Sequence, residues 1–207
     1  EANVVPGLAN RLCANVATGM FLTYEKTRHR LSGSGEKHVV GVPVNPAVMQ
    51  GDRSSAANRY ALDPNQPTVL LVGGSLGAQR INDLAMSVIQ SPDRSFQVLV
   101  LCGPKYYEAM DPLLDPRPAG VCLVDYEHNM ADAYSMADLV VCRAGSSTLA
   151  ELCAVGKASV LVPSPNVTEN HQEENARGLE SVGAAEVLVE HGWDPKQCTQ
   201  TVIDLMS

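Results

Sequence analysis

Residues 137–151 read Ala-Asp-Leu-Val-Val-Cys-Arg-Ala-Gly-Ser-Ser-Thr-Leu-Ala-Glu and join two kinds of local structure in one short stretch. The apolar run that ends at Val141 predicts a buried strand, and the polar residues after Gly145 predict the first turn of a helix. A strand that leads through a short loop into a helix is the repeating unit of α/β folds. This stretch therefore favours an α/β architecture.

The same strand-then-helix unit recurs from residue 67 to the end of the chain. Apolar runs of strand length occur at 68–72, 96–101, 121–124, 138–142, 158–162 and 185–189. Helical patterns separate or follow them at 77–90, 104–114, 129–136, 146–155, 170–182 and 194–206. This alternation predicts an α/β fold with a doubly wound, Rossmann-like parallel sheet. Such sheets bind their ligands beyond the carboxyl ends of the strands.

The first third of the chain is less regular. Its pattern predicts a helix at 7–17, a strand at 20–23, a loop at 27–37 and a strand at 38–42. The stretch 45–66 is polar and has no clear period. The chain begins at Glu1, without a methionine, so we expect it to be a fragment of a longer protein.

Composition limits the classes of function. The 207 residues are 45% apolar, which is enough for one α/β domain with extra segments. The net charge of −8 argues against non-specific binding of nucleic acid, which needs clustered Lys and Arg. The six cysteines have no C-x-x-C spacing, and several lie in apolar runs. They are typical of buried thiols in a reducing compartment and not of disulfides or zinc ligands.

The predicted helix start after Gly145 is a candidate phosphate site. Helix N-termini offer free N–H groups and a positive dipole end, and the hydroxyls of residues 146–148 add further donors. Glu151, one turn later, could accept hydrogen bonds from a ribose diol. The pair Thr148 and Glu151 also matches a capping box, in which side chains satisfy helix N–H groups and bind no ligand. The segment alone leaves both interpretations open.

Two further loops carry polar residues at the expected ends of strands. In the first, Gly73-Gly74-Ser75-Leu76-Gly77, the glycines allow a close approach of backbone to ligand, or serve only helix–strand packing. This loop lacks the G-x-G-x-x-G pattern, which disfavours a nicotinamide dehydrogenase. In the second, residues 162–176, Asn170, His171 and Gln172 suit sugar hydroxyls. His171 taken alone is more typical of a surface or capping residue.

The three loops together resemble the donor-binding half of the MurG family of glycosyltransferases. The motifs are Gly73-Gly-Ser-x-Gly-Ala78 with Asn82, Met130-Ala-x-Ala-Tyr-x-x-Ala-Asp138, Cys142-Arg-Ala-Gly145 with Thr148 and Glu151, Pro163, Asn170-His-Gln172 with Asn175-Ala176, and Gly183-Ala-Ala185. The opening Glu1-x-Asn3-x-x-Pro6-Gly7-x-x-Asn10 is similar to the end of that family's N-terminal domain. Members transfer N-acetylglucosamine from UDP-N-acetylglucosamine to lipid I, the lipid-linked acceptor of peptidoglycan synthesis.

The resemblance implies a hexosyltransferase of the two-domain GT-B fold that needs no metal or other cofactor. Residues 1–45 would be the end of the acceptor domain and the interdomain segment, 46–66 a linker, and 67–207 the UDP-sugar donor-binding domain, truncated at its C-terminus. The catalytic residues, the acceptor site and the membrane contact would lie in the absent N-terminal domain, so this fragment alone would be inactive. The full-length protein would be cytoplasmic and peripheral at the inner face of the plasma membrane, with no nucleic-acid partner.

The resemblance also assigns the candidate donor-binding residues. Gly74, Ser75 and Gly77 would contact the diphosphate or sugar. The helix start would hold the α-phosphate through Gly145, Ser146, Ser147 and Thr148. Glu151 would hold the ribose, and the N-acetylglucosamine would contact His171 and Gln172. The uracil would lie near Tyr126 and Glu127.

Two departures from the family pattern stand near this site. Asn45 replaces an arginine that approaches the donor, and Glu127 replaces an apolar residue of the uracil pocket. Loss of a guanidinium near a diphosphate removes a strong charge-assisted contact. The sequence therefore keeps open a non-catalytic or degenerate UDP-sugar-binding subunit. It also keeps open another GT-B enzyme, either a glycolipid glycosyltransferase or a UDP-sugar 2-epimerase.

Overall fold

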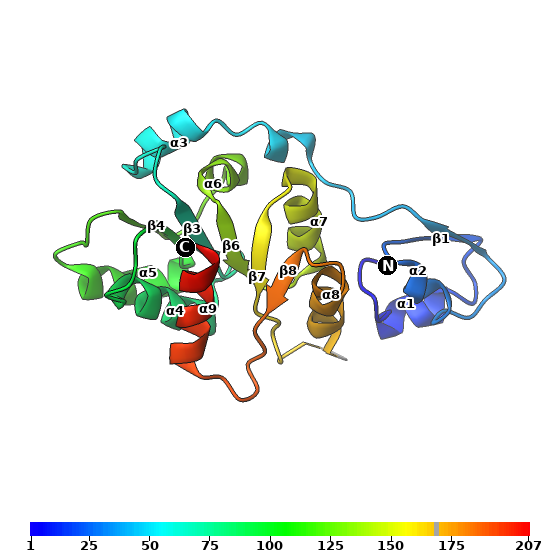
Figure 1. The fold of residues 1–207 in the computed structure, drawn as a ribbon. Helices are drawn as coiled ribbons and strands as arrows, with labels where there is room; N and C mark the ends of the chain where they lie inside the picture. Colours follow the sequence, from blue (N-terminus) through cyan, green and yellow to red (C-terminus); the bar gives the residue numbers. More distant parts are fainter. Residues whose placement is uncertain (168–169) are drawn as a thin grey trace.

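The computed structural model describes residues 1–167 and 170–207, and it has a small N-terminal unit beside a larger α/β body (Figure 1). The strands of the body are β3 (Thr68–Val72), β4 (Gln97–Leu101), β5 (Val121–Val124), β6 (Leu139–Cys142), β7 (Ala158–Leu161) and β8 (Ala185–Val187). They form one sheet in the order β5-β4-β3-β6-β7-β8, and all neighbouring strands are parallel. This order is that of a doubly wound Rossmann-like sheet, as the sequence predicts.

Helices cover both faces of this sheet (Figure 1). The helices on one face are α4 (Gln79–Gln90), α5 (Pro104–Met110) with the short 3₁₀ helix η2 (Asp111–Leu114), and α9 (Pro195–Leu205). Those on the other face are α3 (Arg53–Tyr60), α6 (Met130–Met136), α7 (Ser146–Val155) and α8 (His171–Glu180). Each layer packs on the sheet through its own cluster of buried apolar side chains.

Strand β3 shows why these runs are mostly apolar. All five of its residues are buried. Val69 and Leu71 belong to the cluster with α4, whereas Leu70 and Val72 belong to the cluster with α6 and α7. A parallel strand that is covered on both faces has no solvent-facing side, so a polar residue would be buried at either register position.

The N-terminal unit consists of α1 (Leu8–Cys13), β1 (Gly19–Leu22), α2 (Glu25–Arg28) and β2 (Glu36–Val39), with β1 and β2 paired in parallel. Helix α1 is shorter than the predicted 7–17, because Asn15 and Val16, which follow its end, have low helix propensity. Helix α2 takes the first residues of the predicted loop at 27–37.

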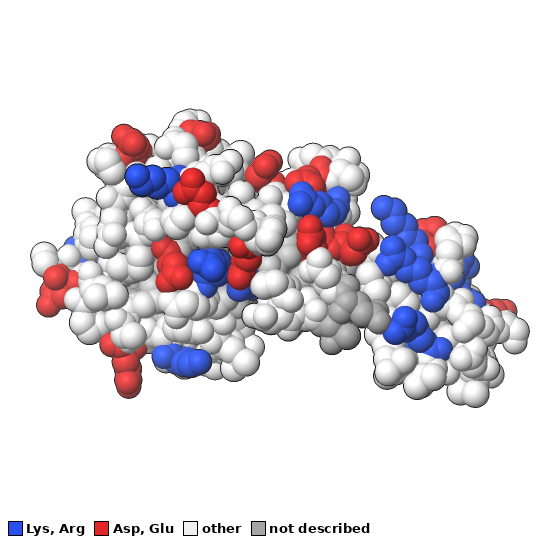
Figure 2. Space-filling model, turned by 90° about the horizontal axis from the view of Figure 1, so that it is seen from below, with Lys and Arg blue, Asp and Glu red and all other residues white. Residues whose placement is uncertain are grey.

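Polar contacts and charge distinguish this unit from the body. The side chain of Asn175 on α8 accepts from Val4 N at 3.1 Å and donates to Asn3 Oδ1 at 3.1 Å. Residues 1–45 hold five Lys or Arg and three Glu, although the whole chain is acidic. Figure 2 shows the basic side chains gathered over the right-hand part of the molecule, where Figure 1 places this unit. Within the described ranges, no helix has both the length and the apolar character that crossing a bilayer requires.

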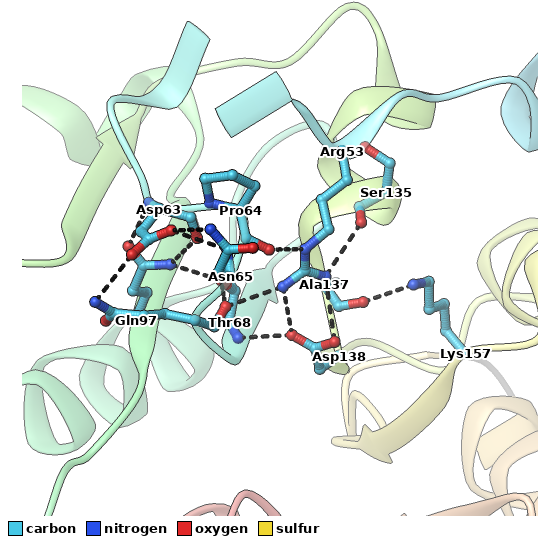
Figure 3. A network of polar contacts seen from close by, with 11 residues as sticks. Arg53, Asp63, Pro64, Asn65, Thr68, Gln97, Ser135, Ala137, Asp138 and Lys157 are labelled. Atoms are coloured by element: carbon cyan, nitrogen blue, oxygen red, sulfur yellow. Dashed lines mark hydrogen bonds and ion pairs between the residues drawn. The ribbon is translucent and has the colours of Figure 1, made fainter. Parts of the chain in front are cut away.

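The stretch 46–66, which has no clear period in the sequence, holds the 3₁₀ helix η1 (Pro46–Met49) and helix α3. The guanidinium of Arg53 forms a two-pronged ion pair with Asp138, Nη1 to Oδ1 at 3.2 Å and Nη2 to Oδ2 at 2.9 Å. It also donates from Nε to the carbonyl of Pro64 at 2.8 Å, and Asp138 accepts from Thr68 N at 2.8 Å (Figure 3). Charge pairing thus fixes α3 at the amino end of β3 and β6.

The burial of the cysteines gives a first prediction. Cys13 and Cys153 are exposed, whereas Cys102, Cys142 and Cys198 are buried. Burial raises the pKa of the Cys142 thiol to about 12. At about pH 8, iodoacetamide should therefore label Cys13 and Cys153 readily and spare Cys142, as read by peptide mass spectrometry, since the thiolate is the reactive form. Labelling of Cys142 at the rate of Cys13 in the native protein would contradict the buried placement.

The raised pKa of Cys142 also determines how the stability of the fold changes with pH. The folded protein holds the Cys142 proton more tightly than the unfolded chain, whose cysteine thiols titrate near pH 9. The free energy of unfolding should therefore fall as the pH rises from about 9 toward 12, measured by denaturant titration.

Candidate functional site

The last residues of five strands are aligned with one another across the sheet. Val72 pairs with Leu101 and with Cys142, Leu101 pairs with Val124, and Cys142 pairs with Leu161. The loops that follow these residues therefore start side by side along one edge of the sheet. Between β3 and β6 the direction of the connections reverses, which opens a crevice at the site where doubly wound folds bind ligands.

Two pockets lie at this edge and contain most of the candidate residues. The first, of about 180 Å³, is lined at the switch between β3 and β6 by six of them: Gly74, Ser75, Tyr126, Glu127, Thr148 and Glu151. The second, of about 480 Å³, includes Gly77 and Gln172. Arg143, directly after β6, lines both pockets. The structure thus brings the three polar loops of the sequence together.

The glycine loop after β3 has two functions. Gly74 has a φ of +85° and open space around it, and it lines the first pocket. Gly77 has a φ of +75°, and a Cβ there would stand 2.1 Å from the carbonyl oxygen of Cys102. Packing alone therefore requires Gly77, whereas Gly74 lets the backbone reach the pocket.

Helix α7 begins at the pocket without a capping box. The N-cap residue is Gly145, so Ser146, Ser147 and Thr148 are the first three helical residues and Thr148 is not the cap. The carboxylate of Glu151 instead accepts from Tyr134 Oη at 2.8 Å. The capping interpretation is therefore wrong, and the backbone N–H groups of the first turn remain available to an anion.

Tyr134 holds Glu151 in place at the pocket wall. Burial and the nearby Glu151 charge raise the pKa of Tyr134, so its phenol remains a hydrogen-bond donor at neutral pH. The bond orients the Glu151 carboxylate, which still lines the pocket and can accept from a diol there. Tyr134 lies in the motif that begins at Met130, but the sequence pattern alone does not indicate its contact with Glu151.

Glu127 has a different environment from the one that the sequence suggests. Its side chain is only 1% exposed. Its carboxylate accepts from Arg59 Nη2 at 2.8 Å, from Tyr60 Oη at 2.7 Å and from Asn129 N at 2.6 Å. The residue borders the pocket, but its charge is directed to helix α3. Tyr126, beside it, is 41% exposed.

Side chains from two directions contact the residues that directly follow β7. His171 and Gln172 are the first residues of α8, and Gln172 Oε1 accepts from Ser164 N at 2.9 Å. Arg143 Nη1 donates to the carbonyl of Val162 at 3.0 Å and to Glu190 Oε1 at 2.6 Å. Residues 168–169, which belong to the polar loop at 162–176, lie outside the described residues.

The arginine that the resemblance expects at position 45 has no substitute there. Asn45 caps η1, its side chain accepting from Ala47 N at 3.0 Å. Arg143 is a basic side chain that lines both pockets. It lies in the motif Cys142-Arg-Ala-Gly145, but the sequence alone gives it no function. Its position directly after a buried strand at the ligand edge is the signal that could have identified it.

The fold is that of the C-terminal half of a GT-B glycosyltransferase, the half with a Rossmann-like sheet. The model of the glycosyltransferase family 28 C-terminal domain matches residues 68–207. The chain therefore belongs to this family. The expectation of a site without metal or cofactor remains a prediction, as do the roles of the individual residues.

Named relatives agree with this assignment. Two relatives carry the name UDP-N-acetylglucosamine--N-acetylmuramyl-(pentapeptide) pyrophosphoryl-undecaprenol N-acetylglucosamine transferase. They come from Caldanaerobacter subterraneus and Symbiobacterium thermophilum and are 34% and 36% identical to this chain. Both alignments cover 100% of this chain, and they cover 58% and 56% of the relatives. This chain thus spans little more than half the length of these curated proteins. The resemblance to the MurG family is confirmed.

Solved structures show the same fold. MurG of Acinetobacter baumannii superimposes with a TM-score of 0.75 at 30% identity, covering 100% of this chain and 57% of that one. WaaG, a glycosyltransferase of lipopolysaccharide biosynthesis, superimposes with a TM-score of 0.60 at 14% identity, over 90% of this chain and 53% of that one. The second likeness concerns the fold alone.

Proposed function

We propose that this chain binds UDP-N-acetylglucosamine, as the donor-binding part of a glycosyltransferase that transfers N-acetylglucosamine to lipid I. The observation that carries the proposal is the pocket at the β3–β6 switch. One wall of this pocket combines a helix N-terminus with the oriented carboxylate of Glu151. The names of the similar transferases supply the identity of the sugar and of the acceptor.

Each part of the pocket has a chemical role in this proposal. The N–H groups at the start of α7 and the positive end of its dipole stabilise the α-phosphate. Glu151 accepts from the ribose hydroxyls, and Gly74 lets the loop after β3 approach the diphosphate. Gln172 faces the second pocket, where the sugar hydroxyls would lie. Neither a metal ion nor a cofactor is part of the proposal.

The remaining functions belong to the longer protein. Deprotonation of the acceptor hydroxyl, binding of the lipid-linked acceptor and contact with the inner face of the plasma membrane would reside in an N-terminal domain. Turnover assays of the full-length protein with several UDP-sugars would separate a transferase for N-acetylglucosamine from an enzyme for another sugar or a binding subunit without activity.

Isothermal titration of this chain with UDP-N-acetylglucosamine tests the proposal directly. We expect one binding site, competition by UDP and no effect of a metal chelator, because the helix N-terminus supplies the compensating charge. A folded chain that gives no binding heat and no competition would overturn the proposal. Loss of binding with the chelator would overturn its metal-free form.

A further inference from the structure

Ion pairs connect both ends of helix α3 to helix α6 or the residues just after it, and we call each of these connections a clasp. The residues that pair α3 with the body run in opposite order along the chain, so the two helices are antiparallel neighbours. At the start of α3, Arg53 binds Asp138 just beyond the end of α6. At its end, Arg59 Nη1 binds Asp132 in the first turn of α6 at 3.1 Å. Figure 1 shows the two helices side by side.

The two clasps lie at opposite edges of the sheet. The Arg53 clasp is at the amino ends of the strands, where Asp138 precedes β6 and also accepts from the first residue of β3 (Figure 3). The clasp at the end of α3 also includes Tyr60 and Glu127, because Arg59 Nη2 and Tyr60 Oη both donate to the Glu127 carboxylate, which lies in the loop at the carboxyl end of β5. Only this clasp therefore reaches the pocket edge.

The loop 125–129 forms one wall of the first pocket, and its shape depends on Glu127. Three donors converge on this carboxylate, one from within the loop and two from α3. Burial, together with Glu127, raises the pKa of Tyr60, so the phenol keeps its donor role at neutral pH. A buried carboxylate with three donors fixes its backbone far more tightly than an apolar side chain at this position could.

We propose that Arg59, Tyr60 and Glu127 are positioning residues for the nucleotide base: they hold the loop 125–129 in the shape that receives the uracil. This inference rests on the proposed function, because it assumes that UDP occupies the pocket. The loop 125–129 is on the β4–β5 side of the switch, whereas the start of α7 is on the β6 side. Loss of the clasp should therefore weaken recognition of the base and leave the phosphate site unchanged.

Helix α3 is thus part of the donor site although it precedes the family match at residue 68. Its sequence has little apolar character, and Arg59 and Tyr60 couple it to the pocket through Glu127. An apolar residue at position 127 would leave Arg59 with Asp132 as its acidic partner at this end.

The experiment compares two ligands across matched variants. Dissociation constants for UDP and for inorganic diphosphate are measured by isothermal titration for the wild-type chain and for E127Q, R59M, R59K and R53M. We expect UDP to bind about tenfold more weakly to E127Q and R59M, the effect of one lost charged hydrogen bond, with diphosphate within about twofold of wild type. R59K keeps the positive charge and should recover part of the loss.

The control variant R53M removes the Arg53–Asp138 ion pair at the amino ends of the strands. It should lower the melting temperature and leave the ratio of the UDP and diphosphate constants within about twofold of wild type. Arg59 is 46% exposed, so R59M should fold even where substitution of the buried Glu127 prevents folding. All titrations are made at a temperature well below the melting temperature of the variant concerned.

The outcomes separate the inference from the function on which it rests. A wild-type chain that is folded and does not bind UDP overturns the proposed function. A wild-type chain that binds UDP, with R59M binding it equally well, overturns the positioning role. Parallel losses of UDP and diphosphate affinity in R59M also overturn it, because they indicate general destabilisation.

Discussion

Replacement of Glu151 by alanine should weaken binding of UDP about 100-fold. The carboxylate can accept two hydrogen bonds from the ribose diol, and each such bond to a charged group contributes about 1.5 kcal/mol or more. The fold should lose less, about 1–2 kcal/mol, because only the Tyr134 phenol is left without its acceptor. Isothermal titration and denaturant unfolding measure the two losses separately.

A ligand without the 2′-hydroxyl makes this test specific. The wild-type chain should bind UDP more tightly than its 2′-deoxy form, and E151A should bind both equally. The control variant Y134F removes the tether and keeps the acceptor, so it should change UDP affinity by only a few-fold. If E151A still distinguishes the two ligands, Glu151 is not the acceptor of the ribose.

Replacement of Gly77 by alanine should have the largest effect on stability and on the phosphate loop together. The φ of +75° disfavours any side chain, and the added Cβ would stand 2.1 Å from the Cys102 oxygen and 2.7 Å from Tyr106 Cδ2. The left-handed conformation costs about 1 kcal/mol, and the overlap adds about 1–3 kcal/mol. Denaturant unfolding should show a loss of about 2–4 kcal/mol, and diphosphate affinity should fall as the loop shifts.

Gly183 is the matched control for this substitution. It has nearly the same φ, +72°, and no heavy atom within 4 Å of the position that a Cβ would take. G183A should therefore lose only the conformational part, about 1 kcal/mol. Equal losses in G77A and G183A would show that contact with Cys102 does not limit this loop.

The sequence predicts the α/β body well because burial there is decided locally. The strands at 68–72 and 121–124 and the helix at 146–155 have the predicted bounds, and the other elements of the body differ by a few residues at their ends. The strands of a parallel sheet that is covered on both faces are mostly apolar, so each run is visible without knowledge of its neighbours. The loops at the carboxyl ends could be predicted to meet for the same topological reason.

Side-chain pairing across the fold could not be predicted in this way. The buried face of helix α3 consists of only Ala56, Ala57 and Tyr60, and the ion-pair partner of Arg53, Asp138, lies 85 residues later in the chain. The sequence presents Glu127 only as a departure within the uracil pocket, because its partners on α3 lie 67 and 68 residues away in the chain. Contacts of this range depend on the folded arrangement and leave no local pattern.

The packing of α3 also determines where a self-sufficient recombinant donor fragment can start. Ala56, Ala57 and Tyr60 are buried in the apolar cluster that covers one face of the sheet. A polypeptide that starts at residue 68, the border of the family match, would lack α3. The apolar surface that α3 covers would then be exposed to water and to other copies. The minimal soluble fragment should therefore begin before η1, and the shorter one should associate or precipitate during expression.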